Sequence, residues 1–496
     1  MRQYRALNFS TAQNQSQTRD GSDNEDFYRF TSGRWLWNEE FRLQERYKKF
    51  NVPGLKSLAA KACGAQSCIS MVKLAEGGFN KVFRLDMDDG KVVMARIPTP
   101  IVGPISRVLA SEVATMDFAR NVLDIPVPKV IAWDGERANA AWCEFILMEE
   151  AKGNPLAAIW PIMELDEKFK IVEEVVGIQK KLQSVTFSRP VRKPPTAIYQ
   201  DLRRRLIRFS AQSYLRAISQ RERSKCALRE TPADPQDDSN SLDSPQARLS
   251  LLHKFEAISA YLPPSQQSLN RGTLFHWDLR APNFFIEDGR ITSLIDWQDA
   301  WIAPLFMQER RPQLLEYDGE MMLRLPDYFE TIENKAEKVK VQAQVERSIL
   351  SWYYHRVVRE RLPALQELFD LPLARMRRET VLFASDIWEG ENVPLRECLY
   401  QLQRQWDKLN TNIACPIHFS SQEIKAHEEA SSDWNDRAKF WASLSGFVSP
   451  DGYTSLEDYE EARRVFKELR EEGLRSLSGK ELAEFEDQST WVERLG

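Results

Sequence analysis

The sequence predicts an α+β protein with two lobes: a small one built on an antiparallel sheet and a large one that is mostly helical. Two observations predict this class. Residues 71–97 contain three short runs of strand character, joined by a glycine-rich loop and by the turn Asp88-Asp89-Gly90. From about residue 154 onward, apolar residues recur mainly at helical spacing. Segregation of strands from helices is typical of the α+β class.

The composition excludes several other classes. Of the 496 residues, 42% are hydrophobic, which is enough for a substantial core. The formal net charge of −5 argues against a nucleic-acid-binding protein. The six cysteines show no metal-binding spacing and indicate reduced thiols in an intracellular protein. No run approaches 18 apolar residues, so no transmembrane segment is expected.

The first 26 residues are interpreted as a disordered tail or a transit peptide. Residues 1–19 contain three Arg and no acid, with many Ser, Thr and Gln. This composition fits a short mitochondrial presequence and, equally, a disordered polar tail. Residues 27–70 are expected to form a helical extension that includes a helix over 52–63. The aromatic residues of this extension are expected to pack a short helix on the outside of the protein.

The small lobe is predicted to span residues 71–153, with strands over 71–75, 81–87 and 91–97. The loop between the first two strands contains Gly77 and Gly78. Two adjacent glycines let backbone N–H groups approach an anion closely. A phosphate-binding loop and an ordinary hairpin turn both fit this feature taken alone.

The stretch from Leu274 to Ile302 contains the residues with the clearest chemistry. Asp278 precedes Asn283 by five residues, and Asp296 follows thirteen residues later. The Asp288-Gly289 step between two short apolar runs predicts a hairpin turn. Because a hairpin brings its two ends together, Asn283 and Asp296 are expected to lie side by side. An amide oxygen beside a carboxylate suits Mg²⁺, and Asp278 could accept a proton from a hydroxyl. An ordinary surface hairpin with scattered polar residues is the alternative.

This order of residues resembles the catalytic loop of protein-kinase-like phosphotransferases, in which HxDxxxxN precedes a hairpin and a second Asp. Here the second Asp lies in Ile295-Asp296-Trp297, with Ala303-Pro304 soon after, a variant typical of the aminoglycoside phosphotransferase (APH-like) family. The resemblance implies a two-lobed protein-kinase-like fold that binds ATP and Mg²⁺. It implies Asp278 as catalytic base and Asn283 and Asp296 as metal ligands.

The resemblance also implies a set of nucleotide-binding residues in the small lobe. Arg96 lies where the family has a phosphate-binding Lys, and Glu112, on a helix expected over 106–123, lies where its acidic partner would be. A surface cation and a solvated helix acid are the competing interpretations. The segment after residue 148 resembles the adenine-binding hinge. The residues implied for the nucleotide are Gly77, Gly78, Asn80, Arg96, Glu112, Met148, Glu149 and Ala151.

Longer strings are similar to fungal mitochondrial members of this family, of the "altered inheritance of mitochondria protein 9" type. They include KLAEGGFNKVF (73–83), ARIPTP (95–100) and FILMEE (145–150). Residues from about 187 to 269 match less well. This resemblance implies a mitochondrial location, with a cytoplasmic one as the alternative. It does not identify a substrate.

The large lobe is expected to comprise residues 154–304 with the catalytic loop, followed by a helical part over 305–496. Residues 228–245 are rich in Pro, Asp and Ser and contain almost no apolar residue after Leu228, so they are predicted to form a disordered loop. Helices are expected over 166–184, 199–219, 246–261, 335–369, 373–388 and 395–410. The charged helical stretches 455–475 and 480–494 are expected to be solvated.

The function predicted from these observations is an ATP- and Mg²⁺-dependent phosphotransferase. The acceptor would be a hydroxyl of an unidentified small molecule or protein, and the oligomeric state cannot be deduced from the sequence. A non-catalytic nucleotide-binding or scaffold protein is the alternative, favoured by Arg96 in place of Lys. A nucleotidyl transfer is a third possibility.

Overall fold

The computed structural model describes residues 24–187, 210–228, 244–387, 392–409 and 412–495. The chain divides into two compact units. Among the described residues, the large unit contains those of Ala114–Pro128 and Ala151–Trp434, and the small unit contains those from 24 to 113, Lys129–Glu150 and those from 435 to 495. Most of the predicted N-terminal tail, nearly all of the predicted loop over 228–245 and half of the helix expected over 199–219 lie outside the described residues.

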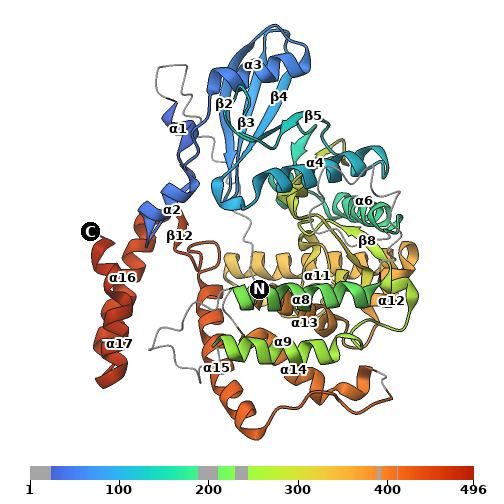
Figure 1. The fold of residues 1–496 in the computed structure, drawn as a ribbon, viewed down its shortest axis with the longest axis vertical. Coiled ribbons are helices and arrows are strands. Elements are labelled where there is room, and N and C mark those ends of the chain that lie inside the picture. Colours follow the sequence, from blue (N-terminus) through green and yellow to red (C-terminus); the bar gives the residue numbers. More distant parts are fainter. Residues whose placement is uncertain (1–23, 188–209, 229–243, 388–391, 410–411, 496) are drawn as a thin grey trace. The chain divides into compact units, whose positions relative to one another are not determined.

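The small unit is built on a five-stranded antiparallel sheet (Figure 1). The strand order is β2-β3-β4-β6-β5. The sheet contains the three strands predicted within residues 71–97 and two strands from the segment before residue 149. The first two predicted strands are longer than expected, and the third has the expected length but begins and ends one residue later. The bounds are β2 Cys68–Glu76, β3 Asn80–Met87, β4 Val92–Pro98, β5 Val130–Asp134 and β6 Phe145–Met148.

One face of this sheet is covered by α3, Val52–Cys63 (Figure 1). The helix has the predicted bounds because local signals define both ends. The Asn51 side chain accepts a hydrogen bond from the Gly54 N–H at 3.3 Å, and Gly64 ends the helix with a φ of 75°. The buried Leu55 and Ala59 of α3 pack with alternate side chains of β3, among them Phe83 and Leu85.

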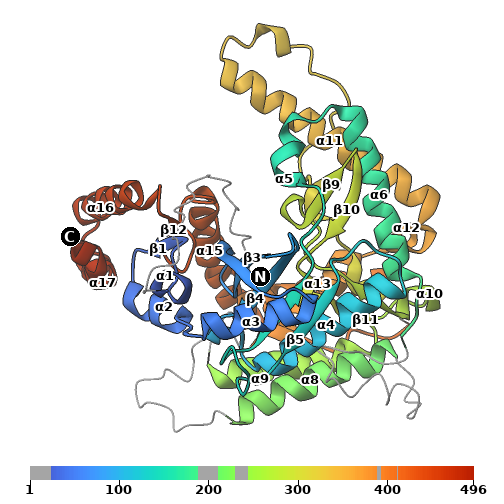
Figure 2. The same cartoon turned by 90° about the horizontal axis from the view of Figure 1, so that it is seen from above.

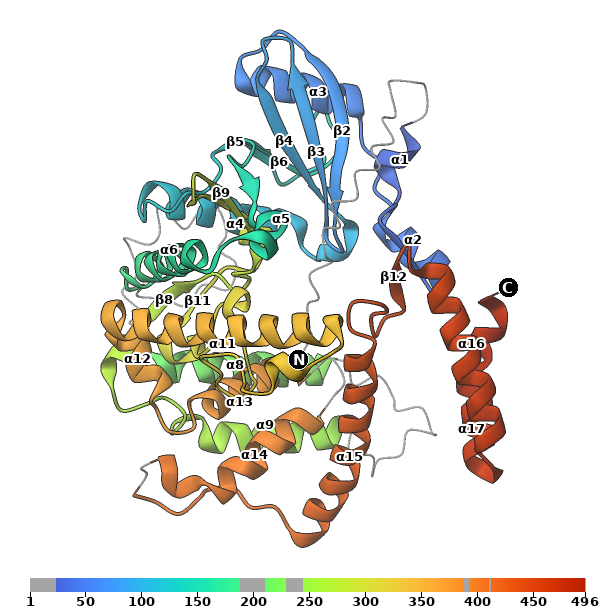
Figure 3. The same cartoon turned by 180° about the vertical axis from the view of Figure 1, so that it is seen from behind.

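The small unit also joins the two ends of the chain. Strand β1, Gly33–Trp35, lies between α1 (Glu25–Tyr28) and α2 (Glu39–Arg46), and it pairs antiparallel with β12, Tyr453–Ser455. The helices α16, Tyr459–Ser476, and α17, Gly479–Ser489, follow β12 and lie side by side (Figure 3). This arrangement differs from the expected assignment of all residues after 304 to the large lobe.

The aromatic residues of the N-terminal extension explain this association. The Trp37 ring packs on that of Trp491, with centroids 4.7 Å apart, and Trp35 donates a hydrogen bond from Nε1 to Asp451 at 3.2 Å. Helix α16 therefore has a buried face, which includes Phe466, beside the solvated face that its charges predicted. Of the aromatic residues expected to pack locally, Phe41 is exposed.

The large unit is mostly helical, as predicted, and its core lies among α6, α8, α9 and α11 to α14 (Figure 3). The helix expected over 335–369 is two helices, because Pro363 cannot continue the first one. The first turns of α11 project from the rest of this unit (Figure 2). The bounds are α6 Leu165–Gln183, α8 Ala211–Leu228, α9 Pro245–Ser259, α11 Lys335–Arg361, α12 Pro363–Phe369, α13 Ala374–Asp386 and α14 Val393–Arg404.

Two small sheets cross this helical unit and position the candidate site. Strands β9, Phe284–Glu287, and β10, Arg290–Leu294, form a hairpin, and β7, Asn154–Pro155, pairs with β9. Strand β8, Gly272–Phe275, pairs with β11, Trp301–Pro304. The predicted α+β class, with a small antiparallel sheet and a larger helical part, is confirmed. Within the described residues, none of the helices combines the length and the apolar character that a membrane crossing needs.

Candidate active site

The β9–β10 hairpin turns at Asp288 and Gly289, as the sequence predicted. Both residues have positive φ angles, 51° and 72°, as a tight two-residue hairpin turn requires. The hairpin brings its two ends together, because the Ile295 N–H donates a hydrogen bond to the Asn283 carbonyl at 3.0 Å. Asn283 and Asp296 are therefore at the same end of the hairpin, in neighbouring positions.

Asn283 also holds the loop that carries Asp278. The Asn283 side chain is buried, and its Nδ2 donates to Asp278 Oδ2 at 2.8 Å and to the Asp278 carbonyl at 2.9 Å. Because the amide nitrogen makes both bonds, the amide oxygen Oδ1 is the atom that remains for a cation or another donor. The structure thus brings Asp278 and Asn283 into direct contact.

His276 connects the Asp278 loop to the strand end that carries Asp296. Its ring is buried against Trp297, its Nε2 lies 3.1 Å from the Ile295 carbonyl, and its Nδ1 accepts the Asp278 N–H at 3.3 Å. These partners fit a neutral ring that carries its proton on Nε2. Burial lowers the pKa of His276, and the nearby carboxylates of Asp296 and Asp278 oppose that shift. His276 therefore braces the site.

Asp296 has a left-handed backbone conformation, with φ 63° and ψ 61°. Asp tolerates this region better than most residues, but a non-glycine residue there is strained by about 1–3 kcal/mol. The next residue anchors the bend, since the buried Trp297 donates from Nε1 to the Leu294 carbonyl at 3.0 Å. Strain of this kind gathers at functional sites, because it fixes the direction of a side chain.

The oxygen ligands at this end of the hairpin fit a magnesium ion that takes its remaining ligands from water and phosphates. Asp296 supplies a carboxylate, and Asn283 supplies an amide oxygen whose own nitrogen is committed to Asp278. Among the described residues, no three His, Cys, Asp or Glu side chains form a metal-holding group. Mg²⁺ commonly binds through one or two protein oxygens and takes its other ligands from water and phosphates.

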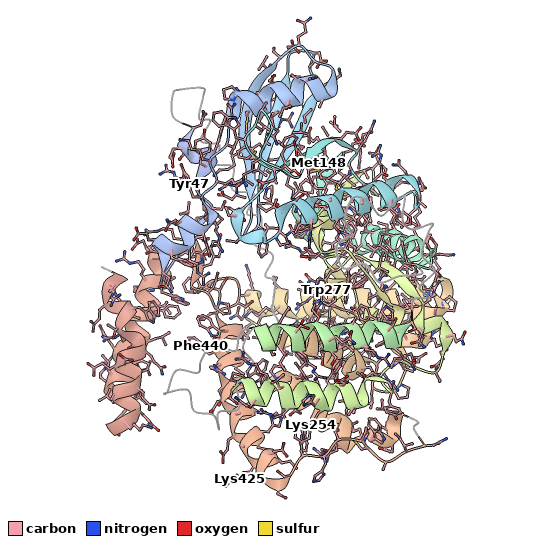
Figure 4. All side chains as sticks on the ribbon, viewed as in Figure 1. Tyr47, Met148, Lys254, Trp277, Lys425 and Phe440 are labelled. Atoms are coloured by element: carbon pink, nitrogen blue, oxygen red, sulfur yellow. The ribbon has the colours of Figure 1, made fainter. Side chains whose placement is uncertain are left out.

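Arg280 contacts the proposed base and was missed by the sequence argument. Its Nε donates to Asp278 Oδ2 at 2.7 Å, and the side chain is largely buried. The one available signal was its position two residues after Asp278. A second arginine, Arg310, lies over the ring of Trp277, which is labelled in Figure 4, at 5.1 Å.

The glycine-rich loop in the small unit is closed by its own backbone. The Gly77 N–H donates to the Asn80 carbonyl at 2.9 Å, and the Thr99 N–H donates to the Phe79 carbonyl at 2.8 Å. A Cβ added at Gly77 or Gly78 would meet no atom within 4 Å. Packing within the small unit therefore does not require glycine at these two positions, whereas close approach of a ligand would.

Arg96 and Glu112 form a buried ion pair in the small unit. Arg96 lies on β4 opposite Val82 of β3, whereas Lys81 lies on the other face of β3 with Phe83. Lys81 therefore does not take the place of the lysine that the family has at the position of Arg96. The guanidinium is held by a carboxylate in the arrangement that the sequence argument expected for these two residues.

The expected hinge begins at Met148, the last residue of β6, which is labelled in Figure 4. Met148 pairs with Met94 and with Val130 of the neighbouring strands. The Glu149 N–H donates to the Lys129 carbonyl at 2.9 Å, and the Glu149 carboxylate accepts the Lys129 N–H at 3.2 Å. Ala151, the other expected hinge residue, is the first residue of its segment in the large unit.

The comparison with family models covers the stretch that contains the glycine-rich loop and the β9–β10 hairpin. Residues 71–307 match the model of the phosphotransferase enzyme family (APH). The resemblance identified from the catalytic stretch is confirmed.

The chain is also similar to curated fungal proteins over most of its length. A subtelomeric hrmA-associated cluster protein of Aspergillus fumigatus is 28% identical over 82% of this chain and 94% of its own length. "Altered inheritance of mitochondria protein 9, mitochondrial" of Kluyveromyces lactis is 22% identical over 87% of this chain and 88% of its own length. The protein of the same name in Saccharomyces cerevisiae is 21% identical. The expected mitochondrial location agrees with the names of these yeast relatives.

Solved structures of aminoglycoside phosphotransferases show lower similarity. A thermostable mutant of APH(4)-Ia in ternary complex with ADP and hygromycin B has a TM-score of 0.39 and 14% identity, covering 73% of this chain and 99% of that one. The streptomycin–ATP–APH(2")-IIa ternary complex has a TM-score of 0.37 and 13% identity, covering 71% of this chain and 95% of that one.

Proposed function

We propose that this protein transfers the γ-phosphoryl group of ATP, with Mg²⁺, to a hydroxyl of a small molecule or protein. The observation that carries the proposal is the pair of hydrogen bonds from Asn283 to Asp278, in a loop that His276 joins to the backbone beside Asp296. Such a group can orient an acceptor and a metal together, which is most of what phosphoryl transfer needs.

Asp278 is proposed as the base that orients and deprotonates the acceptor hydroxyl. Its Oδ2 accepts from Arg280 and Asn283, so the carboxylate is held in one orientation and Oδ1 is the oxygen that would take the proton. The Arg280 guanidinium, 2.7 Å from Oδ2, is the charged partner that fixes this orientation.

The other residues are proposed to bind the nucleotide. Asn283 and Asp296 would hold Mg²⁺, which when bound neutralises charge on the phosphates. The glycine-rich loop (Gly77, Gly78 and Asn80) and the Arg96 guanidinium, held by Glu112, would bind the phosphates. The Gly77 N–H bonds to the Asn80 carbonyl and shapes the loop, so the loop would use its other N–H groups for the phosphates. The hinge residues Met148, Glu149 and Ala151 would bind adenine, Glu149 and Ala151 through their backbone.

The substitution Asp278→Asn tests the base. An Asn side chain has the same shape and still offers an oxygen to Asn283, so ATP binding should be nearly unchanged. Turnover should fall by roughly 10²- to 10⁴-fold, the usual contribution of a positioned base. The measurement is transfer of label from γ-labelled ATP to a metabolite extract. Asp288→Asn, which removes a carboxylate at the turn of the same hairpin, is the matched control and should keep full activity. Equal turnover in both variants would contradict the role of Asp278.

A nucleotide-binding protein without catalysis is the second candidate. Arg96 favours it, because a guanidinium in place of an ammonium changes the geometry of phosphate contacts. Parallel incubations with γ-labelled and α-labelled ATP separate the possibilities. Label from the γ position alone supports a kinase, and label from the α position supports nucleotidyl transfer. ATP binding without transfer of either label supports the non-catalytic protein.

A further inference from the structure

A buried ion pair lies at the base of the glycine-rich loop. Glu76 is the last residue of β2, and Lys81 is its register partner on β3, so the two residues flank the loop. Their side chains contact each other and are fully buried, with exposures of 1% and 0%. Nothing in the proposed reaction uses either side chain. Arg96 faces one side of the sheet with Val82, whereas Lys81 and its partner Glu76 lie on the other side.

The Glu76 carboxylate is also held by the N-terminal extension. It accepts the Thr31 N–H at 2.7 Å, the Thr31 hydroxyl at 3.3 Å and the Ser32 hydroxyl at 3.4 Å. Lys81 donates in addition to the Arg29 carbonyl at 2.9 Å. The two ends of the glycine-rich loop are thus hydrogen-bonded to one short segment, residues 29–32.

That segment is in turn held by the C-terminal part of the chain. Tyr453 on β12 donates from its hydroxyl to the Ser32 carbonyl at 3.0 Å, and β12 pairs with β1 immediately after Ser32. Burial raises the pKa of Tyr453 to about 12, and the Glu76 carboxylate contributes to that shift. Within the small unit, the C-terminal strand β12 therefore contacts the segment 29–32, which in turn holds the glycine-rich loop.

Stability alone is a weak explanation for this arrangement. A buried ion pair is often no more stabilising than apolar residues of the same size, because both charges lose their hydration. Burial lowers the pKa of Lys81 to about 8 against the opposing effect of Glu76, which indicates how much hydration the pair has lost. What the pair supplies, and apolar residues would not, is directional hydrogen bonding to the segment 29–32.

We propose that Glu76 and Lys81 are positioning residues, through which residues 29–32 and the C-terminal strand β12 hold the glycine-rich loop in its phosphate-binding conformation. The proposal rests on the proposed function, and it deepens it by making the two chain ends part of the nucleotide site. In the proposed function the loop binds the phosphates and the hinge binds adenine. A loosened loop should therefore weaken ATP binding and leave adenosine binding unchanged.

The test compares Glu76→Gln with Glu144→Gln in the full-length protein. Glu144 belongs to another buried ion pair of the small unit, with Lys48, which also holds the N-terminal extension but does not flank the loop. Glu76→Gln should raise the Kd of MgATP by roughly tenfold. Glu144→Gln should leave it unchanged, and adenosine should bind both variants as it binds the parent protein. Isothermal calorimetry measures all the affinities.

A second variant and a second measurement cover failure of the first. Glu76 also contacts the largely buried Lys73, which donates to the Arg29 carbonyl at 3.2 Å. Replacing the carboxylate and both lysines by apolar residues, Glu76→Leu with Lys73→Met and Lys81→Met, should preserve folding while it removes the hydrogen bonds to residues 29–32. Amide hydrogen exchange over residues 77–80 should become faster in both Glu76 variants, and this measurement does not depend on any nucleotide. Unchanged loop exchange, or an equal loss of ATP and adenosine affinity, would overturn the proposal. If the parent protein binds no ATP but loop exchange is still faster in the Glu76 variants, the result would contradict the proposed function and leave the positioning role intact.

Discussion

At the scale of single residues, the hydrogen bonds of the site fix each side chain and leave one of its oxygen atoms for a metal ion or a substrate. Asn283 commits its nitrogen to Asp278, and Asp278 commits one oxygen to Asn283 and Arg280. The sequence placed Asp278, Asn283 and Asp296 in order, because their spacing around a hairpin is a local property. It could not show the contact of Arg280 with Asp278, since the orientation of an arginine side chain depends on its surroundings.

Asp296→Asn should abolish the magnesium dependence of nucleotide binding. Asn tolerates the left-handed backbone at this position as well as Asp does, so the variant removes the charge without adding strain. Calorimetric titration of ATP with and without Mg²⁺ measures the effect. A magnesium dependence equal to that of the parent protein would show that Asp296 is not a metal ligand.

The lowered pKa of His276 predicts how the stability of the folded protein depends on pH. Its folded pKa lies below the unfolded value of about 6.5, so below that pH the unfolded chain takes up a proton that the folded protein does not. Stability should therefore fall as the pH decreases below about 6.5, by at most about 1.4 kcal/mol per pH unit from this group.

Urea unfolding of the parent protein and of His276→Gln at pH 7.5 and 5.5 measures this contribution. The parent should lose more stability between the two pH values than the variant does. His355, whose pKa is also lowered by burial, contributes equally to both proteins and cancels in the comparison. An identical loss in both would show that His276 is not held neutral.

At the scale of elements, the β9–β10 hairpin determines whether Asn283 and Asp296 are neighbours. The turn was predictable, because Asp-Gly is one of the few pairs that accept two positive φ angles. The strands of the small sheet were predictable for a similar reason, since alternation of buried residues is visible in the sequence. The extra residues at the strand ends were not, because pairing with a neighbour determines where a strand stops.

Gly289→Ala should destabilise the protein by about 1 kcal/mol, because Ala is strained at a φ of 72°. It should also lower phosphotransferase activity, since a displaced turn shifts Asp296 relative to Asn283. Gly177→Ala on α6 is the matched control. A Cβ there meets no atom within 4 Å, and Ala should stabilise the helix by about 0.5–1 kcal/mol. Equal effects of the two substitutions in urea unfolding would contradict the role of the turn.

At the scale of the whole molecule, the chain ends belong to one unit although they are distant in sequence. Ser32 and Tyr453, which share a hydrogen bond, are 421 residues apart. The sequence analysis assigned the C-terminal helices to the large lobe because it could follow only chain order. Their apolar side chains, among them Phe466, fit the aromatic residues of the N-terminal extension, and this match is a tertiary property.

Trp35→Ala should loosen the C-terminal segment. The buried indole packs against Tyr453, with ring centroids 5.2 Å apart, and bonds Asp451. Its removal should cost roughly 3–5 kcal/mol. Hydrogen exchange should become faster over β12 and α16, while α11 in the large unit keeps its protection. Unchanged exchange over β12 would show that the two chain ends are not coupled.

The sequence by itself determined the hairpin, the order of the acidic and amide residues on it, the strands of the small sheet and the resemblance to a phosphotransferase family. These depend on turn chemistry and on side-chain alternation, which act between near neighbours in the chain. Only the tertiary structure decided that His276 joins the Asp278 loop to the backbone beside Asp296, that Arg280 contacts Asp278, and that Glu76 and Lys81 connect the glycine-rich loop to both chain ends. Those contacts join residues with no local relation, and burial and hydrogen-bond geometry selected them from many alternatives.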